Sequence, residues 1–365
     1  MPTYFKNLLI ITMSGALLCG FLHNFVEGYN FERLHIFLFN LCSGGSVILA
    51  FVSNFKKNYS YILMFFGLSF LYAFMAFFEL YIFAVILSIL LFLIVEKIRK
   101  SQFVNIAMFF NRNIDASYKF QHASLLCLSI ALVISIFAII NHYINLFYFR
   151  KLTLDSFFLG FSFPISLITF SVIFALIDGM SEAQHKRLLI LKELMFWTIN
   201  AGVVIFFVFI LIENEPLELF ISTVLSGAVA TSFILFIFFS KQRQEKFFLI
   251  SGMLFLIVSA ITGIIYILIV VTCNDKWILN IILDYHRLVS LYGWNLAGIA
   301  IICRHNDFPI KLNSKSAIFL HWLTVAVFAP LALFSKVFSI VAVACYLAFL
   351  IIMFYSKSSN ASNEI

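Results

Sequence analysis

The chain has 365 residues, of which 63% are hydrophobic and only 11% are charged. A soluble domain carries about 25% charged residues, so this composition excludes a soluble globular protein. The net charge of +7 does not indicate nucleic-acid binding, because the basic residues stand in short segments between apolar runs, as membrane orientation requires.

Apolar runs of about 20 residues, the length that crosses a bilayer, predict an all-α, polytopic transmembrane helix bundle of about twelve spans. The third and fourth spans share one apolar stretch of twice that length, which we divide at Phe78-Glu79. The predicted spans are 8–26, 33–54, 60–77, 80–96, 122–147, 155–178, 191–212, 217–240, 247–272, 278–303, 317–334 and 337–356.

These spans predict one transmembrane bundle over 1–356, followed by a short polar tail at 357–365. The first apolar run resembles a signal peptide, but no small-residue cleavage site follows it, so we expect an uncleaved first helix. The longest loop, 96–119, is too short to form a core of its own. Any chemistry is therefore expected within or beside the bundle.

The basic residues predict how the bundle is oriented. Alternating sides from a cytoplasmic N-terminus places 18 of the 24 Lys and Arg inside and five outside, with Arg287 inside a span. This is the positive-inside pattern, and it predicts both termini in the cytoplasm. Merging the third and fourth spans would destroy the bias. The outer loops are acidic, and Glu27, Glu32 and Arg33 are interpreted as a solvated rim.

The predicted topology assigns a place to each of the eight histidines and six cysteines. The cysteines form no CxxC pair and are interpreted as small buried residues. We interpret His185 and His305 as basic loop residues. His122, His142 and His321 lie near span ends, where amphipathic rings serve as interface anchors.

His35 and His286 differ, because each lies in the outer half of a span that runs from outside to inside. Small residues follow each of them, and so do the amides Asn40 and Asn295. Neutral imidazole is an axial ligand for haem iron, and small residues would let a porphyrin approach the backbone. The same small residues also serve close helix packing, so both interpretations stay open.

The segments His35-Ile-Phe-Leu-Phe-Asn-Leu-Cys-Ser-Gly-Gly45 and His286-Arg-Leu-Val-Ser-Leu-Tyr-Gly-Trp-Asn-Leu-Ala-Gly298 resemble the second and tenth helices of haem–copper oxidase subunit I. The helix count and the cytoplasmic N-terminus agree. The resemblance implies that His35 and His286 ligate one low-spin haem b near the outer face. Arg287 could then meet a haem propionate, because guanidinium binds carboxylates bidentately.

The chain departs from that family in its sixth and seventh spans, which lack the copper-ligand histidines, and at Asp284, where the family has a second histidine. A copper centre is therefore not expected. His35 also lies about six residues nearer the start of its span than His286, a depth difference of roughly 9 Å. Either the second helix begins earlier than predicted, or the two imidazoles do not share a ligand.

The other charges in or bordering spans are Glu79, Asp155, Asp178, Glu193 and the pair Asp284 and Arg287. Asp284 and Arg287 are three residues apart and are neighbours on one helix face. They form either an internal ion pair, which offsets the cost of burying charge, or a site for an anion. Charges inside a span indicate a functional site by default.

Three hypotheses follow. The first is a haem-binding electron-transfer protein, with a quinone or another redox membrane protein as partner. The second is a secondary transporter of a small solute or ion, with its site around Asp284 and Arg287. The third is an enzyme acting on lipid-linked substrates, although the loops are short for that role. All three place the chain in a bilayer, in a prokaryotic inner or plasma membrane, without nucleic acid.

Overall fold

The computed structural model describes residues 1–365 except 54, 56, 104, 145–158, 179–181, 242, 274, 306, 308–309 and 358–365. Asp155, the ends of the fifth and sixth predicted spans that meet there, and nearly all of the polar tail lie outside the described residues. So do Lys56, Arg150 and Lys151, which contribute to the predicted charge bias.

The described residues form helices and no sheet. The elements are α1 (Thr3–Leu22), α2 (Phe31–Ile36), η1 (Phe37–Gly45), α3 (Ser46–Val52), α4 (Tyr59–Phe77), α5 (Tyr81–Gln102), η2 (Ile106–Phe110), α6 (Ala116–Ile144), η3 (Leu159–Ser162), α8 (Phe163–Leu176), α9 (Glu182–Leu211), α10 (Glu215–Phe239), α11 (Glu245–Thr272), α12 (Lys276–Leu288), η4 (Val289–Asn295), α13 (Leu296–Cys303), η5 (Lys311–Asn313), α14 (Lys315–Leu323), η6 (Thr324–Phe328), α15 (Ala329–Ala332) and α16 (Lys336–Tyr355). The all-α prediction is confirmed.

Ten helices in the described part of the chain are long and apolar enough to cross a membrane, where the sequence predicts about twelve spans. Two predicted spans fall outside this set. In the sixth, α8 is apolar but shorter, at 14 residues. In the tenth, α12, η4 and α13 follow one another without a break over 276–303. Three charged residues, Lys276, Asp284 and Arg287, lie on α12.

The predicted division between the third and fourth spans is confirmed. The chain turns between α4 and α5, and Glu79 takes a φ of 59°, a left-handed conformation that is uncommon for residues other than glycine. The Arg33 side chain supports this turn, because its Nη1 donates to the Ala76 carbonyl at 3.0 Å and to the Tyr81 hydroxyl at 3.2 Å. Arg33 is only 6% exposed, so its predicted place on a solvated rim is wrong.

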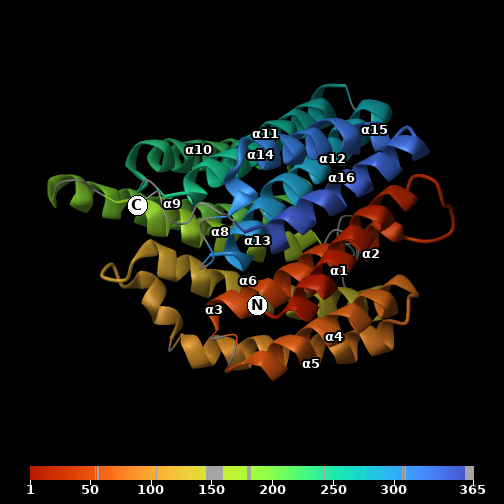
Figure 1. Ribbon diagram of the computed structural model, residues 1–365, viewed down its shortest axis with the longest axis horizontal. Coiled ribbons are helices and arrows are strands. Elements are labelled where there is room, and N and C mark those ends of the chain that lie inside the picture. Colours follow the sequence, from red (N-terminus) through yellow and green to blue (C-terminus); the bar gives the residue numbers. More distant parts are fainter. Residues whose placement is uncertain are drawn as a thin grey trace.

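Most contacts in the described bundle join helices that are consecutive in the chain, and α16 also contacts α1. The span formed by α2, η1 and α3 contacts both α1 and α4. In Figure 1, α4 and α5 lie at one edge and α10 and α11 at the other. The inner helices α3, α8 and α13 contact one another, so the second, sixth and tenth predicted spans meet at the centre.

Three of the long helices change to π-helical turns in their middle. These are η1 between α2 and α3, η4 between α12 and α13, and η6 between α14 and α15. The segments η4 and η6 contact each other, and η1 contacts α8. Such turns are rare and occur frequently at functional sites. The sequence pattern does not predict these turns.

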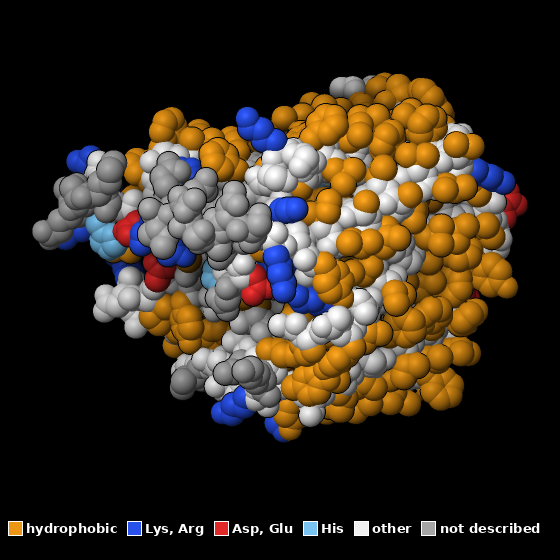
Figure 2. All heavy atoms as spheres, in the orientation of Figure 1, with side chains coloured by type: hydrophobic (Ala, Val, Ile, Leu, Met, Phe, Trp, Pro, Cys, Tyr) orange, Lys and Arg blue, Asp and Glu red, His pale blue; other side chains and the backbone are white. Residues whose placement is uncertain are grey.

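Large apolar side chains cover the outside of the bundle (Figure 2), as expected for a surface that faces lipid. We call the two ends of the bundle the basic end, where α5 ends and α6 begins, and the acidic end, which includes the α1–α2 and α4–α5 turns. Lys and Arg gather at the basic end (Figure 2). These features are those of an integral membrane protein.

The cysteines are all free, but they are not uniformly buried. Cys42 is buried, Cys273 is exposed on the α11–α12 turn, and the other four are intermediate. The prediction of small buried residues is therefore wrong for Cys273.

Candidate functional site

A cleft lies between α1, α2 and α12 at the acidic end. Its volume open to water-sized molecules is about 60 Å³. Its lining contains six polar side chains and seven residues that are apolar or glycine: Leu17, Gly20, Phe21, His23, Asn24, Glu32, His35, Ile36, Asp284, Arg287, Leu288, Leu291 and Leu333. We call this the outer cleft.

Arg287 is the centre of an ion triad in the outer cleft. Its Nη1 lies 2.8 Å from Glu32 Oε1 and 3.3 Å from Asp284 Oδ1. The three side chains are 26–34% exposed, so water reaches them although they lie between helices. The predicted ion pair between Asp284 and Arg287 is confirmed. Glu32 is paired with Arg287 from another helix, which corrects its interpretation as a solvated rim residue.

The triad leaves part of the Arg287 guanidinium unused. Its Nε is buried and has no hydrogen-bond partner among the described residues. A buried donor without an acceptor is costly. Because the Nε–Nη2 edge of a guanidinium binds carboxylates and similar groups, an acceptor on a bound solute would satisfy this atom.

His35 lies at the bottom of the outer cleft. Its Nδ1 is 3.0 Å from the Ala16 carbonyl and 2.7 Å from the Tyr292 hydroxyl. The ring rests on Gly20, where an added Cβ would lie 2.4 Å from Nδ1. Only glycine leaves room for the imidazole at this position, so α1 and α2 approach closely at the cleft.

His286 faces a different helix. Its Nδ1 lies 2.9 Å from the Ser259 carbonyl and 3.1 Å from the Thr262 hydroxyl, both on α11. Asp284 and Arg287, which are also on α12, line the outer cleft. Residues 284 and 286 are two apart and point to different sides of a helix.

The structure therefore brings together two of the three predicted site residues, His35 and Arg287, and separates His286 from them. His35 is level with Tyr292, because their side chains are hydrogen-bonded. Tyr292 is six residues beyond His286, or roughly 9 Å along the helix. His35 is therefore the deeper of the two histidines, which reverses the depth difference predicted from the sequence. The second helix begins at Phe31, two residues earlier than predicted.

Neighbouring side chains fill the space beside the glycines that follow the two histidines. An added Cβ would lie 2.3 Å from Ile165 at Gly44, 2.8 Å from Phe65 at Gly45, and 2.5 Å from Phe255 at Gly293. At Gly298 it would lie 1.9 Å from Thr169. These small residues serve helix packing here. Ligand sites for organic molecules of drug size have about 300–1,000 Å³, far more than the outer cleft. The residues as arranged do not fit a haem held by both imidazoles.

Tyr292 links the cleft to the centre of the bundle. Its carbonyl accepts a hydrogen bond from His321 Nε2 at 2.6 Å, and its ring lies 5.2 Å from that of Tyr346. His321 is 1% exposed and stacks on Phe349. The interpretation of His321 as a helix-end anchor is therefore wrong. Its π-helical surroundings and its burial left no periodic signal in the sequence.

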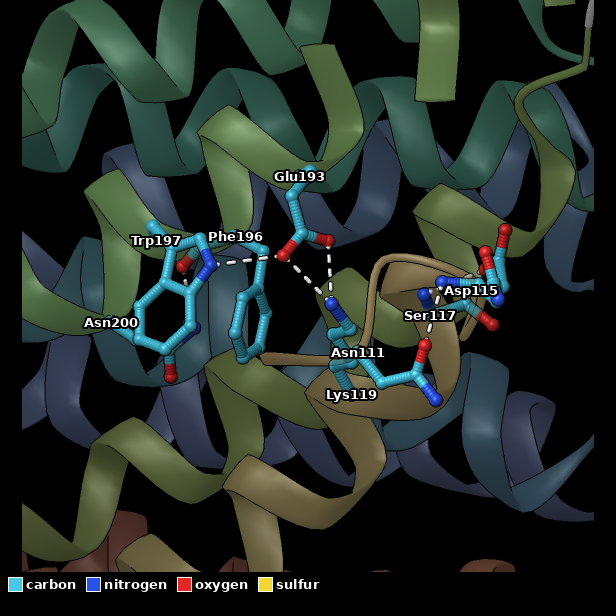
Figure 3. Close-up of polar contacts among 9 residues, drawn as sticks. Asn111, Asp115, Ser117, Lys119, Glu193, Phe196, Trp197 and Asn200 are labelled. Carbon is cyan, nitrogen blue, oxygen red and sulfur yellow. Dashed lines mark hydrogen bonds and ion pairs between the residues drawn. The ribbon is translucent and has the colours of Figure 1, made fainter. Parts of the chain in front are cut away.

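A second polar cluster lies at the basic end, between α6 and α9. Lys119 is fully buried, and its Nζ lies 2.7 Å from both carboxylate oxygens of Glu193. Trp197 Nε1 donates to the same carboxylate at 2.9 Å. Figure 3 shows the three side chains converging from the two helices. This pair joins α6 to α9.

His122 belongs to a neighbouring cluster on α5 and α6. Its ring is fully buried between Phe103 and Phe109, and its Nε2 lies 2.8 Å from Arg99 Nη1. Arg99 also binds Glu96 through two nitrogens at 2.8 Å. His122 is thus a core residue, and its interpretation as an interface anchor is wrong.

His305, after α13, packs edge-on against Phe51. Burial lowers its pKa, an effect that Glu245 opposes and Arg243 adds to. The ring therefore tends to be neutral, which differs from its interpretation as a basic loop residue. In the described ranges, no three His, Cys, Asp or Glu side chains form a group that could hold a metal ion.

Comparison of the chain with protein-family models, with curated proteins and with solved structures found no match.

Proposed function

We propose that the protein is a secondary transporter of a small solute or ion and that the outer cleft is its outward-facing binding site. The observation that carries the proposal is the Glu32–Arg287–Asp284 triad, which lies between helices and is open to water. Ionised side chains within membrane spans mark substrate and ion pathways.

The proposal includes twelve spans with the basic end in the cytoplasm. Two observations support the count: α8 occupies the sixth predicted span, and α12, η4 and α13 run unbroken through the tenth. The bias of 18 inner against five outer basic residues supports the orientation. In this orientation the outer cleft opens away from the cytoplasm.

The π-helical segments support a role in transport rather than a static one. Such turns occur frequently at functional sites, and in transporters the movement of one part of the bundle against another changes access to the site. Here η1 and η4 follow the cleft residues directly on their own helices.

Uptake by whole cells tests the proposal. Cells that express the chain should accumulate at least one compound from a panel of labelled amines, amino acids and carboxylates faster than cells without it. Arg287→Met should abolish the difference at equal membrane abundance. Glu27→Gln, which changes an exposed residue outside the cleft, should retain it. Equal uptake by Arg287→Met and the unchanged chain would reject the cleft as the site.

A single-haem electron-transfer protein, with a quinone or another redox membrane protein as partner, is the second candidate. One observation favours it: the second and tenth spans lie side by side and bring His35 and Arg287 to one cleft. It also requires His286 to leave its contacts with α11. A visible absorption spectrum of purified protein from haem-sufficient cells tests it. A sharp reduced α-band that His286→Ala abolishes would support the haem, and a colourless, folded preparation would exclude it.

A further inference from the structure

We propose that the solute of the outer cleft is a small amine with an oxygen acceptor close to its ammonium group, as in an amino alcohol or an amino acid. The inference rests on the proposed function for its role, but binding can be measured without transport. Three properties of the cleft lead to it: charge, an unused donor and size.

The charge of the cleft favours an ammonium group. Glu32 and Asp284 are two carboxylates against the single guanidinium of Arg287. The Asp, Glu and Arg side chains that line the cleft therefore include one acidic group in excess. A negative charge between helices is stabilised by a cation more strongly than it would be in water.

Each carboxylate also has an oxygen to offer. Arg287 takes Glu32 Oε1 and Asp284 Oδ1. Glu32 Oε2 lies 3.8 Å from His23 Nε2, an ion-pair distance when that ring is protonated but too long for a hydrogen bond. An ammonium group has three donors and could reach both carboxylates.

The unused donor requires an acceptor on the same solute. Arg287 Nε is buried and unpartnered, while Nη1 of the same guanidinium already binds both carboxylates. A hydroxyl or carboxylate oxygen on the solute would accept from Nε while the ammonium group binds beside it. A plain alkylamine would leave this donor unsatisfied, and a plain carboxylate would face two like charges.

The volume limits the solute to a few atoms. The space in the cleft that is open to water-sized molecules, about 60 Å³, is small beside the roughly 300–1,000 Å³ of sites for drug-sized ligands, which favours a solute of a few heavy atoms. Ethanolamine and glycine are of that size. Their methylene carbons would meet the apolar wall formed by Leu17, Phe21 and Leu291.

Thermal unfolding of the full chain in detergent tests the inference. The buffer is phosphate, because many common buffers are themselves amino alcohols. Ethanolamine or glycine should raise the unfolding temperature saturably. Ethylamine, which lacks the oxygen, should need at least a tenfold higher concentration, and acetate should produce no shift. Stabilisation by ethanolamine alone would identify an amino alcohol, and tighter binding of glycine would identify an amino acid.

Variants locate the effect. Asp284→Asn should raise the half-saturating concentration at least tenfold, and Glu27→Gln should leave it unchanged. If Asp284→Asn does not fold, Glu32→Gln on the neighbouring helix serves in its place. Stabilisation by acetate and not by amines, or by none of the four compounds, would overturn the inference. Equal binding of ethylamine and ethanolamine would overturn the requirement for an oxygen. Binding of ethanolamine or glycine without uptake would reject transport and leave this inference standing. Uptake of another solute, without binding of either compound, would reject this inference and leave transport standing.

Discussion

The Tyr292 hydroxyl lies 2.7 Å from His35 Nδ1 and fixes how the second and tenth spans face each other. Glu32 and Arg287 pair one turn nearer the acidic end. These two contacts hold the outer cleft together, and each can be tested by substitution.

Tyr292→Phe removes the hydroxyl and keeps the ring. We expect a loss of about 0.5–1.5 kcal/mol, the net contribution of one hydrogen bond, measured as a lower unfolding temperature in detergent. Tyr355→Phe is the matched control, because that hydroxyl is near the surface, where it bonds Asn7, and water can replace the partner. If both variants unfold at the same temperature, the His35 contact does not stabilise the fold.

Gly20→Ala should displace the His35 ring, because the new Cβ would lie 2.4 Å from Nδ1. Overpacking of this kind costs about 1–3 kcal/mol. Gly15→Ala on the same helix has nothing within 4 Å of its Cβ and should be neutral or slightly stabilising. Thermal unfolding of the pair distinguishes the two positions. A Gly20→Ala protein as stable as Gly15→Ala would contradict the close approach of α1 and α2.

The buried pair of Lys119 and Glu193 predicts that removing one charge costs more stability than removing the other. Glu193→Gln would leave the fully buried Lys119 without its counter-charge, and breaking a buried pair costs about 3–5 kcal/mol. Lys119→Met should cost less, because Glu193 is 22% exposed and keeps its bond to Trp197. The double variant should recover part of the loss. A double-mutant cycle on unfolding temperatures measures this, and additive losses would show that the two charges are not coupled.

Thiol labelling tests the orientation of the bundle. In a Cys273→Ser background, which removes the one exposed cysteine, Asp284→Cys should react with a membrane-impermeant maleimide on intact cells. Lys186→Cys, near the start of α9 at the basic end, should react only after permeabilisation. The opposite pattern would mean that the cleft opens to the cytoplasm.

Much of the fold could be predicted from the sequence, because apolar runs and the turn at Phe78-Glu79 are local signals. Which side of each helix is buried could not be predicted. Most of these helices are apolar all round, so no hydrophobic stripe indicates which side is buried. His286 faces α11 and His35 faces α1 for reasons of packing that spacing does not express.

Only the part of the candidate site that has a local signal could be predicted from the sequence. Asp284 and Arg287 were recognisable because charges within an apolar run are costly. Their third partner, Glu32, was missed because it precedes its predicted span and looked like a loop residue. His122 owes its burial to Phe103 and Phe109. Phe103 follows the end of α5 and Phe109 belongs to the short helix η2, in a segment that the sequence predicts only as a polar loop.

Counterflow in liposomes that contain only the purified chain tests the central claim most directly. Vesicles loaded with unlabelled ethanolamine or glycine should transiently accumulate the labelled compound from outside. Vesicles with Arg287→Met should not, and those with Glu27→Gln should match the unchanged chain. Accumulation that is equal in all three preparations, or absent with the unchanged chain, would contradict a transport site at the Glu32–Arg287–Asp284 triad.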